Sequence, residues 1–238
     1  MSGDDQHPPG RVSQAVHRGL ARLVSKVMHA PDMQATAPIV TDYACGDRRV
    51  RFIAMQHVAQ PVFYAAANAE IRRAKEDGYV HFYEWIDLYE LDDVGQRKVR
   101  RLTATLPMPD CYAAVARETG ERLGLDLVAQ DTEAMLGLVN DLDVCADISP
   151  QEFLLRVEEA TGGIELRPED LEIPLTESVG DPIPPKLWMS AVLDSRNVDL
   201  AEKVDTAPHE RIVITFGSAH EPGWLEEMRL RDGRWARA

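Results

Sequence analysis

The chain has 238 residues, of which 45% are hydrophobic, enough for a substantial core, and this excludes disorder over most of its length. A formal net charge of -14 would repel nucleic-acid phosphates, so nucleic acid is not an expected partner. Three scattered cysteines without a C-x-x-C pair do not make a disulfide framework, and they favour a reducing, cytoplasmic setting.

The N-terminal part predicts a polar start followed by a basic helix. Residues 1–10 lack the apolar stretch of a signal peptide, and we expect them to be disordered. Residues 11–30 place valine and leucine at helical spacing and carry only positive charges. Docking on the protein's own acidic surface is the simpler expectation for this helix, and peripheral contact with a membrane surface is the alternative. No stretch approaches the roughly 20 apolar residues of a membrane-spanning helix.

Three runs rich in β-branched and aromatic residues predict strands. Pro61 is well placed to begin a helix between the first two runs, and Gly78 is well placed to end it. A strand, a helix and a strand with short linkers form the βαβ unit of a parallel sheet. We therefore expect an α/β fold with a mainly parallel central sheet flanked by helices. The strands are expected over 49–55, 79–86 and 211–216, within a single domain over 38–238.

The remaining segments predict further helices, a loop and a hairpin. Residues 94–162 are mostly helical by pattern, with Ser149 as an N-cap, and we expect a helical insertion there. Proline and acidic residues make 166–185 an extended connection, either a lid or a linker. Residues 185–204 predict another helix, and 228–235 predict a small C-terminal hairpin.

Two apolar strands each end a few residues before a histidine, at His57 and at His220. Because parallel α/β sheets bind ligands at the carboxyl ends of their strands, we expect both histidines in one crevice. Glu84 lies at or near the end of the strand between them, where a carboxylate needs a partner or solvent. Structural roles remain open: His57 as a strand cap, and Glu84 in a buried salt bridge with Arg196.

These pieces, in this order, resemble the TraB/PrgY/GumN/Tiki superfamily. Its members carry paired Gly-x-x-His motifs, a glutamate ending a strand between them, and an Arg-Asn pair on a helix before the second motif. The chain departs from this pattern where Ala54 replaces the first glycine, which removes freedom for an unusual backbone angle. The resemblance spans about residue 49 to the C-terminus. The matching segments are 52–58 (FIAMQHV), 82–84 (FYE), 194–197 (DSRN) and 213–223 (VITFGSAHEPG).

Two imidazoles and one carboxylate, from His57, Glu84 and His220, make the three-ligand set of a catalytic metal site with an open position. We therefore predict a divalent metal whose identity the residues do not fix. Arg196 is expected to bind a substrate carboxylate or a developing oxyanion. Glu84 acting as a general base without metal is the alternative. Asn197 and Gly217 are the expected supporting residues.

Three functions are compatible with these residues. The resemblance implies a hydrolase, for example a metal-dependent peptidase acting on a peptide or small-molecule substrate. The second function is a binding or sequestering protein that holds a peptide or another ligand without converting it. The third is a scaffold whose ancestral site has decayed, which is suggested by Ala54. No P-loop, G-x-G-x-x-G or G-x-S-x-G signature supports a nucleotide-binding or serine-hydrolase function.

Overall fold

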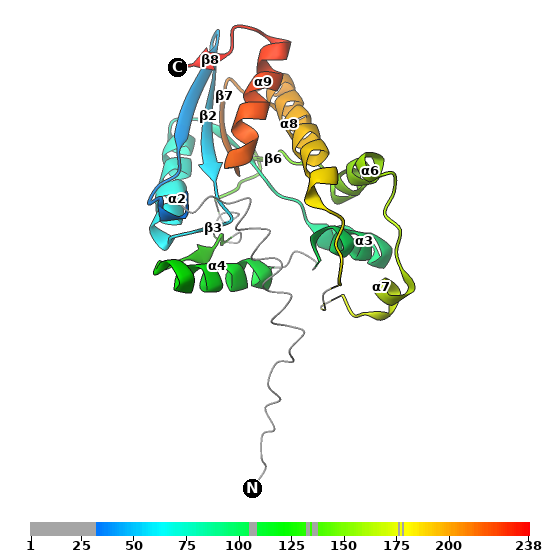
Figure 1. Cartoon of the computed structure of the whole chain (residues 1–238). Coiled ribbons are helices and arrows are strands. Elements are labelled where there is room, and N and C mark those ends of the chain that lie inside the picture. Colours follow the sequence, from blue (N-terminus) through cyan, green and yellow to red (C-terminus); the bar gives the residue numbers. More distant parts are fainter. Residues whose placement is uncertain (1–31, 105–108, 132–133, 135–137, 176, 178) are drawn as a thin grey trace.

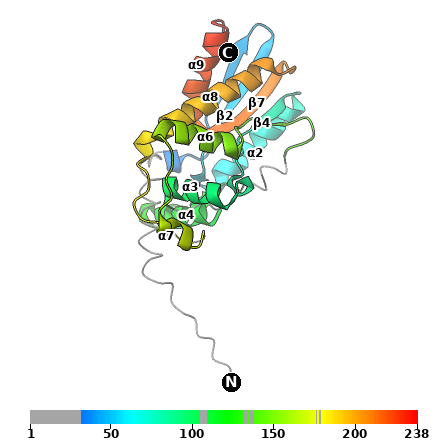
Figure 2. The same cartoon turned by 90° about the vertical axis from the view of Figure 1, so that its right-hand side faces the viewer.

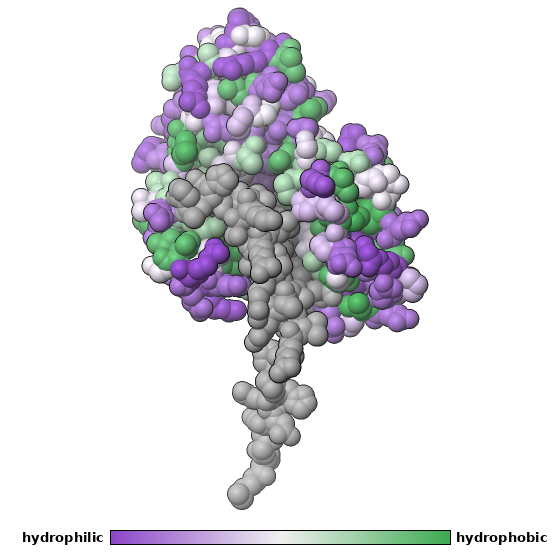
Figure 3. Space-filling view, viewed as in Figure 1, coloured by the Kyte–Doolittle hydropathy of each residue, from purple (hydrophilic) through white to green (hydrophobic). Residues whose placement is uncertain are grey.

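The structure, a computed structural model, describes residues 32–104, 109–131, 134, 138–175, 177 and 179–238. The predicted disordered start, 1–10, and the predicted basic helix, 11–30, lie outside these residues and stay predictions. None of the helices built from the described residues combines the length and the apolar character needed to cross a bilayer. On the face seen in Figure 3, hydrophilic side chains cover most of the coloured surface, and hydrophobic ones lie scattered among them.

A six-stranded sheet in the order β6-β4-β7-β2-β1-β8 forms the centre of the fold. The first four strands of this order run parallel, whereas β1 is antiparallel to both β2 and β8. The predicted α/β class with a mainly parallel sheet is therefore confirmed. The strands are β1 (Val40–Cys45), β2 (Arg48–Met55), β4 (Val80–Tyr83), β6 (Val144–Cys145), β7 (Arg211–Gly217) and β8 (Ala236–Arg237).

Helices cover both faces of this sheet (Figure 1). On one face lies α2 (Pro61–Glu76), whose Ala67, Ile71 and Ala74 are fully buried against the sheet. On the other face lie α8 (Met189–Thr206) and α9 (Glu221–Arg231), which contact each other closely. The larger part of the core is on this second face, where Trp224 packs against Tyr43 and Phe52. The helix α6 (Pro150–Thr161) lies alongside α8 (Figure 2).

Sequence signals for the helix ends agree with the structure. Pro61 is the first residue of α2, and Gly78 follows this helix with φ +84°, a left-handed angle that glycine adopts without strain. The hydroxyl of Ser149 accepts a hydrogen bond from the backbone N–H of Glu152, as predicted for the N-cap of α6. Gly162 ends α6 in a left-handed conformation.

The region 94–162 is not purely helical. It contains most of α3 (Asp93–Thr103), then α4 (Pro109–Leu123) and α6, but also two short strands. The strand β6 is an edge strand of the central sheet, and β5 (Val128–Ala129) pairs with β3 (Val58–Ala59) in a second, two-stranded sheet. The prediction of a helical insertion is thus correct for its helices and misses these strands.

The predicted extended connection over 166–185 contains a five-residue helix, α7 (Pro168–Glu172). Three arginines of α3 hold this connection. Arg97 and Arg100 both donate to the backbone oxygens of Asp170 and Ile173, and Arg101 donates to the oxygen of Gly180. The connection is therefore attached to α3 along its length. The structure also has single turns of 3-10 helix: η1 (Asp32–Gln34), η2 (Leu88–Glu90), η3 (Pro185–Leu187) and η4 (Ser218–His220).

The predicted C-terminal hairpin over 228–235 is wrong. Residues up to Arg231 belong to α9, which begins with proline among its first two positions. The chain then turns, and β8 pairs with β1 instead of with a strand of its own hairpin. Asp232 and Gly233 favour a hairpin turn, and the chain does turn at Gly233, but the residues before the turn belong to a helix instead of a strand.

Candidate active site at the carboxyl edge of the sheet

The residues of the four motifs meet at the carboxyl ends of the parallel strands. Glu84 follows β4 directly, and Gly217 is the last residue of β7, with His220 closing the short turn after it. Because β7 lies between β4 and β2 in the sheet, the segments after these three strands lie at the same edge. Arg196 and Asn197 come from α8, which covers this end of the sheet.

Glu84 is held at both carboxylate oxygens. Arg196 donates from Nη2 to Oε1 at 2.5 Å, and the backbone N–H of Gly217 donates to Oε2 at 2.6 Å. Only 15% of the Glu84 side chain is exposed. Burial alone would raise the pKa of Glu84, but Arg196 and the two site histidines outweigh it and lower the pKa to about 2. Glu84 is therefore ionised at neutral pH and is a weak general base.

Arg196 is shared between two buried carboxylates. Besides Glu84 it contacts Asp147, to which it donates from Nε at 2.8 Å and from Nη2 at 2.6 Å. The Asp147 side chain is fully buried; burial raises its pKa, and the guanidinium of Arg196 opposes this. The hydrogen bonds of Arg196 at Nε and Nη2 therefore hold protein carboxylates. The guanidinium forms the buried salt bridge with Glu84 that was the structural alternative, and its predicted contact with a substrate stays a prediction.

His220 is buried, with 3% of its side chain exposed. Its Nδ1 lies 2.8 Å from Oδ1 of Asn197. Because an amide oxygen only accepts hydrogen bonds, Nδ1 carries the proton, and Nε2 keeps its lone pair. This Nε2 lies 4.0 Å from Oε1 of Glu84. Burial, followed by the positive charge of Arg196, lowers the pKa of His220 to about 4, so the ring is neutral at pH 7.

His57 is the exposed member of the group. It lies in the bend between β2 and β3, and its ring stacks at 5.2 Å on that of Tyr112. Its charge is close enough to lower the pKa of both Glu84 and His220. The structure thus brings together the three residues predicted as metal ligands. Within the described parts of the chain, however, no three His, Cys, Asp or Glu side chains gather closely enough to hold a metal ion.

The two glycine positions of the paired motifs are not equivalent. A Cβ on Gly217 would lie 3.5 Å from Oε2 of Glu84 and 3.6 Å from Cδ2 of His220, so a side chain would extend into the site. Ala54, in contrast, is a buried residue within the regular strand β2, paired with Phe216, and its φ is not left-handed. Alanine is therefore not strained at position 54. Ala54 thus gives no reason to infer that the site has decayed.

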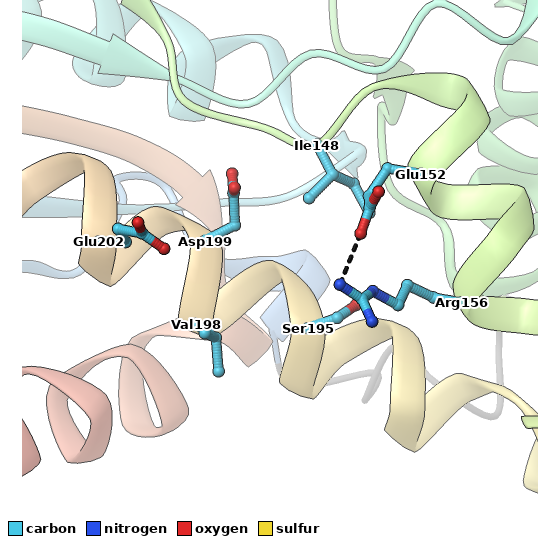
Figure 4. A pocket seen from close by; sticks show the side chains of 7 residues that line it. All are labelled: Ile148, Glu152, Arg156, Ser195, Val198, Asp199 and Glu202. Carbon is cyan, nitrogen blue, oxygen red and sulfur yellow. Dashed lines mark ion pairs between the residues drawn. The ribbon is translucent and has the colours of Figure 1, made fainter. Parts of the chain in front are cut away.

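Two hollows lie beside the site. One, of about 270 Å³, lies between α6 and α8, and Ile148 and Ser195 in its wall are the sequence neighbours of Asp147 and Arg196. Figure 4 shows its acidic side chains and the ion pair between Glu152 and Arg156. The other, of about 470 Å³, lies between the segment after β4 and α6. Of the four motifs only Ser195 lines one of these hollows, and His57, Glu84, Arg196 and His220 line neither.

No family model matches this chain. Searches of curated proteins and of solved structures gave no match either. The resemblance to the TraB/PrgY/GumN/Tiki superfamily therefore rests on the four motifs alone and stays a prediction. What the structure adds is that these motifs, which are separated by up to about 160 positions in the sequence, occupy one place in the fold.

Asp147 is the member of the site that the sequence reasoning missed. It follows the apolar run 144–146 in the same way that Glu84 follows the apolar strand β4, and both runs end at the same edge of the sheet. That signal was present, but the run is short and lies in a region whose pattern is mostly helical. His81 is buried on the strand, where its Nε2 lies 2.7 Å from the hydroxyl of Thr215.

Proposed function

We propose that the chain is a hydrolase whose active site is formed by His57, Glu84 and His220. The observation that carries the proposal is the arrangement of His220. Its Nδ1 is bonded to Asn197, which leaves the lone pair of Nε2 available 4.0 Å from the Glu84 carboxylate. A buried imidazole fixed in one tautomer beside an ionised carboxylate is suited to bind an electrophile, a proton or a metal ion.

The donor groups fit a divalent metal ion in their chemistry. Metal ligands must be deprotonated, and both His220 and Glu84 are deprotonated at neutral pH because their pKa values lie near 4 and 2. Asn197 orients the imidazole in the way that carbonyl groups orient ligating histidines. His57, exposed at the rim, would complete the set by turning toward the pair. A divalent ion held there would supply Lewis acidity, which makes water nucleophilic near neutral pH.

Four residues have defined roles in the proposed site. Glu84 provides negative charge and is too weakly basic to take a proton at neutral pH. Arg196 keeps this carboxylate in place and, with Asp147, balances its charge inside the fold. His57 is positioned to meet a peptide or small-molecule substrate, which can approach only from the exposed side. The proposed setting is reducing and cytoplasmic, because the three cysteines of the sequence are too few and too scattered for a disulfide framework.

Turnover of peptide and ester panels by the purified full chain tests this proposal. We expect His220→Ala and Glu84→Gln to lower the hydrolysis rate by at least about 100-fold, the typical contribution of a positioned catalytic group. His209→Ala is the matched control, because His209 lies in the loop before β7 and belongs to none of the motifs. Equal rates in all four proteins would contradict the proposal.

A second candidate function is binding of a peptide or another ligand without conversion. It is favoured by the fact that both oxygens of Glu84, and Nε and Nη2 of Arg196, already bond to the protein. This candidate predicts saturable ligand binding that His57→Ala weakens, with no product formed by any variant.

A further inference from the structure

The helices α8 and α9 touch at a point where only a hydrogen atom fits. A Cβ built on Gly223, in the first turn of α9, would overlap Nδ2 of Asn197 and lie 3.0 Å from its Cγ. Its third nearest neighbour is Cβ of Asn197, at 3.7 Å. The side chain that a Cβ at position 223 would meet first is thus that of Asn197.

The usual backbone reasons for a glycine do not apply at position 223. Its φ lies outside the left-handed region that favours glycine. It is also part of a helix, where alanine would be the more stabilising residue. Close approach of a neighbouring group is the remaining reason, and the group that approaches is the buried amide of Asn197.

That amide is the partner of the candidate catalytic histidine. Its Oδ1 accepts from Nδ1 of His220, and both residues are buried, so water does not replace this bond easily. Displacing the amide would therefore release the ring. Within the described residues, this is the hydrogen bond that fixes which nitrogen of His220 carries the proton.

We propose that Gly223 is a positioning residue, which keeps the Asn197 amide on Nδ1 of His220 and thereby directs the unprotonated Nε2 toward Glu84. The proposal rests on the site of the proposed function, but it concerns the state of the ring and not turnover. A side chain at position 223 displaces the amide, and the imidazole then no longer has one fixed tautomer. Gly223 acts through Asn197 and does not itself reach the site.

Nuclear magnetic resonance of the ring nitrogens of His220 in the full chain tests the proposal, with His220→Ala to assign the signals. Gly223→Ala is compared with Gly233→Ala, a matched control whose added Cβ would meet no atom within 4 Å and whose φ is not left-handed. We expect one Nδ1-protonated tautomer in the wild type and in the control, and a mixture in Gly223→Ala. An unchanged single tautomer in Gly223→Ala would overturn the proposal.

A double-mutant cycle keeps the test decisive if Gly223→Ala folds poorly. Because the three nearest neighbours of the added Cβ, the overlapping Nδ2 among them, belong to Asn197, Gly223→Ala should lower the unfolding free energy in the wild-type background and not in Asn197→Ala. An equal loss in both backgrounds would contradict the proposal. If Gly223→Ala shifts the tautomer but the wild type hydrolyses no substrate, the proposed function is refuted and the positioning role of Gly223 stands.

Discussion

At the scale of single residues, Asp147 decides the charge balance of the site. It shares Arg196 with Glu84, so two carboxylates face one guanidinium, and its own side chain is fully buried. Removing one member of a buried ion pair leaves the other charge without compensation, which is more costly than the pair itself is favourable. Asp147 is therefore expected to be a stability residue as well as a neighbour of the site.

We expect Asp147→Asn to lower the free energy of unfolding by roughly 3 kcal/mol, as is typical when a buried ion pair is broken. Urea denaturation measures this change. Asp181→Asn is the matched control, because 90% of the Asp181 side chain is exposed and we expect its replacement to have little effect. A loss for Asp147→Asn no larger than that of the control would show that Glu84 alone satisfies Arg196.

The two buried histidines make stability depend on pH. Burial lowers the pKa of His81 and of His220 to about 4, below the ordinary value of 6.5 that applies in the unfolded chain. Between pH 6.5 and pH 4 the unfolded state therefore binds protons that the folded state does not, and stability falls as the pH falls. Each histidine contributes on the order of 3 kcal/mol to this loss. Glu84 adds to it at lower pH, because its folded pKa is also depressed.

Unfolding free energies measured from pH 7 to pH 4.5 check this dependence. In His81→Gln the decline should be shallower than in the wild type by about the contribution of one histidine. His209→Gln, at a position that is only partly buried, should keep the wild-type decline. If His81→Gln and the wild type have the same pH dependence, His81 is not the neutral buried group described above.

Much of the site could be predicted at this scale, because each motif joins a strand end or a helix position to a distinctive side chain. His57, Glu84 and His220 were expected together, and the structure places them at one edge. The salt bridge between Glu84 and Arg196 was one of the expected alternatives, but its sharing with Asp147 could not be predicted, because Asp147 follows a two-residue strand. Local pattern does not reveal so short a strand; its pairing with β4 does.

At the scale of elements, the attachment of 166–185 to α3 distinguishes a linker from a lid. Arg100 is fully buried and donates to the backbone oxygens of Asp170 and Pro174 at 2.7 and 2.5 Å. A side chain that satisfies several carbonyl oxygens at once holds a connection that has few hydrogen bonds of its own. The segment is thus fixed to α3 by arginine, which favours the linker.

We expect Arg100→Ala to free this connection. Hydrogen exchange of the backbone amides over 168–187 should become at least tenfold faster than in the wild type, because the segment opens locally at lower cost. The exchange of β2 and β7 should not change. Arg156→Ala is the control, since Arg156, as far as the structure describes the chain, pairs with Glu152 and Glu159 of its own helix. Unchanged exchange over 168–187 would show that the arginine contacts are not what holds the segment.

The elements also show where sequence patterns are ambiguous. Pro61 and Ser149 were interpreted correctly, because each precedes a clear helical pattern. The turn at Gly233 was expected between two strands, although it follows the helix α9, because a turn signal does not specify the element before it. The C-terminal strand β8 pairs with β1 in place of a hairpin partner, a contact between the two ends of the described chain.

At the scale of the whole molecule, the place of β7 in the sheet brings the segments of the site together. It lies between β2 and β4, although it follows both by more than a hundred positions, and it brings Gly217 beside the end of each. The sequence predicted three strands, a parallel sheet and helices on its faces, since these follow from local pattern and short connections. The order of the strands follows from long-range packing and could not be predicted in the same way.

His57, Glu84 and His220 come from three separate segments, and we propose that they bind one metal ion together. Elemental mass spectrometry of the purified full chain after incubation with divalent metals and removal of the excess tests this proposal most directly, with His57→Ala, His220→Ala and the control His209→Ala. We predict close to one metal ion per chain in the wild type and in the control, and loss of that ion in both site variants. Metal retained equally by all four proteins, or bound by none of them, would contradict a shared metal site.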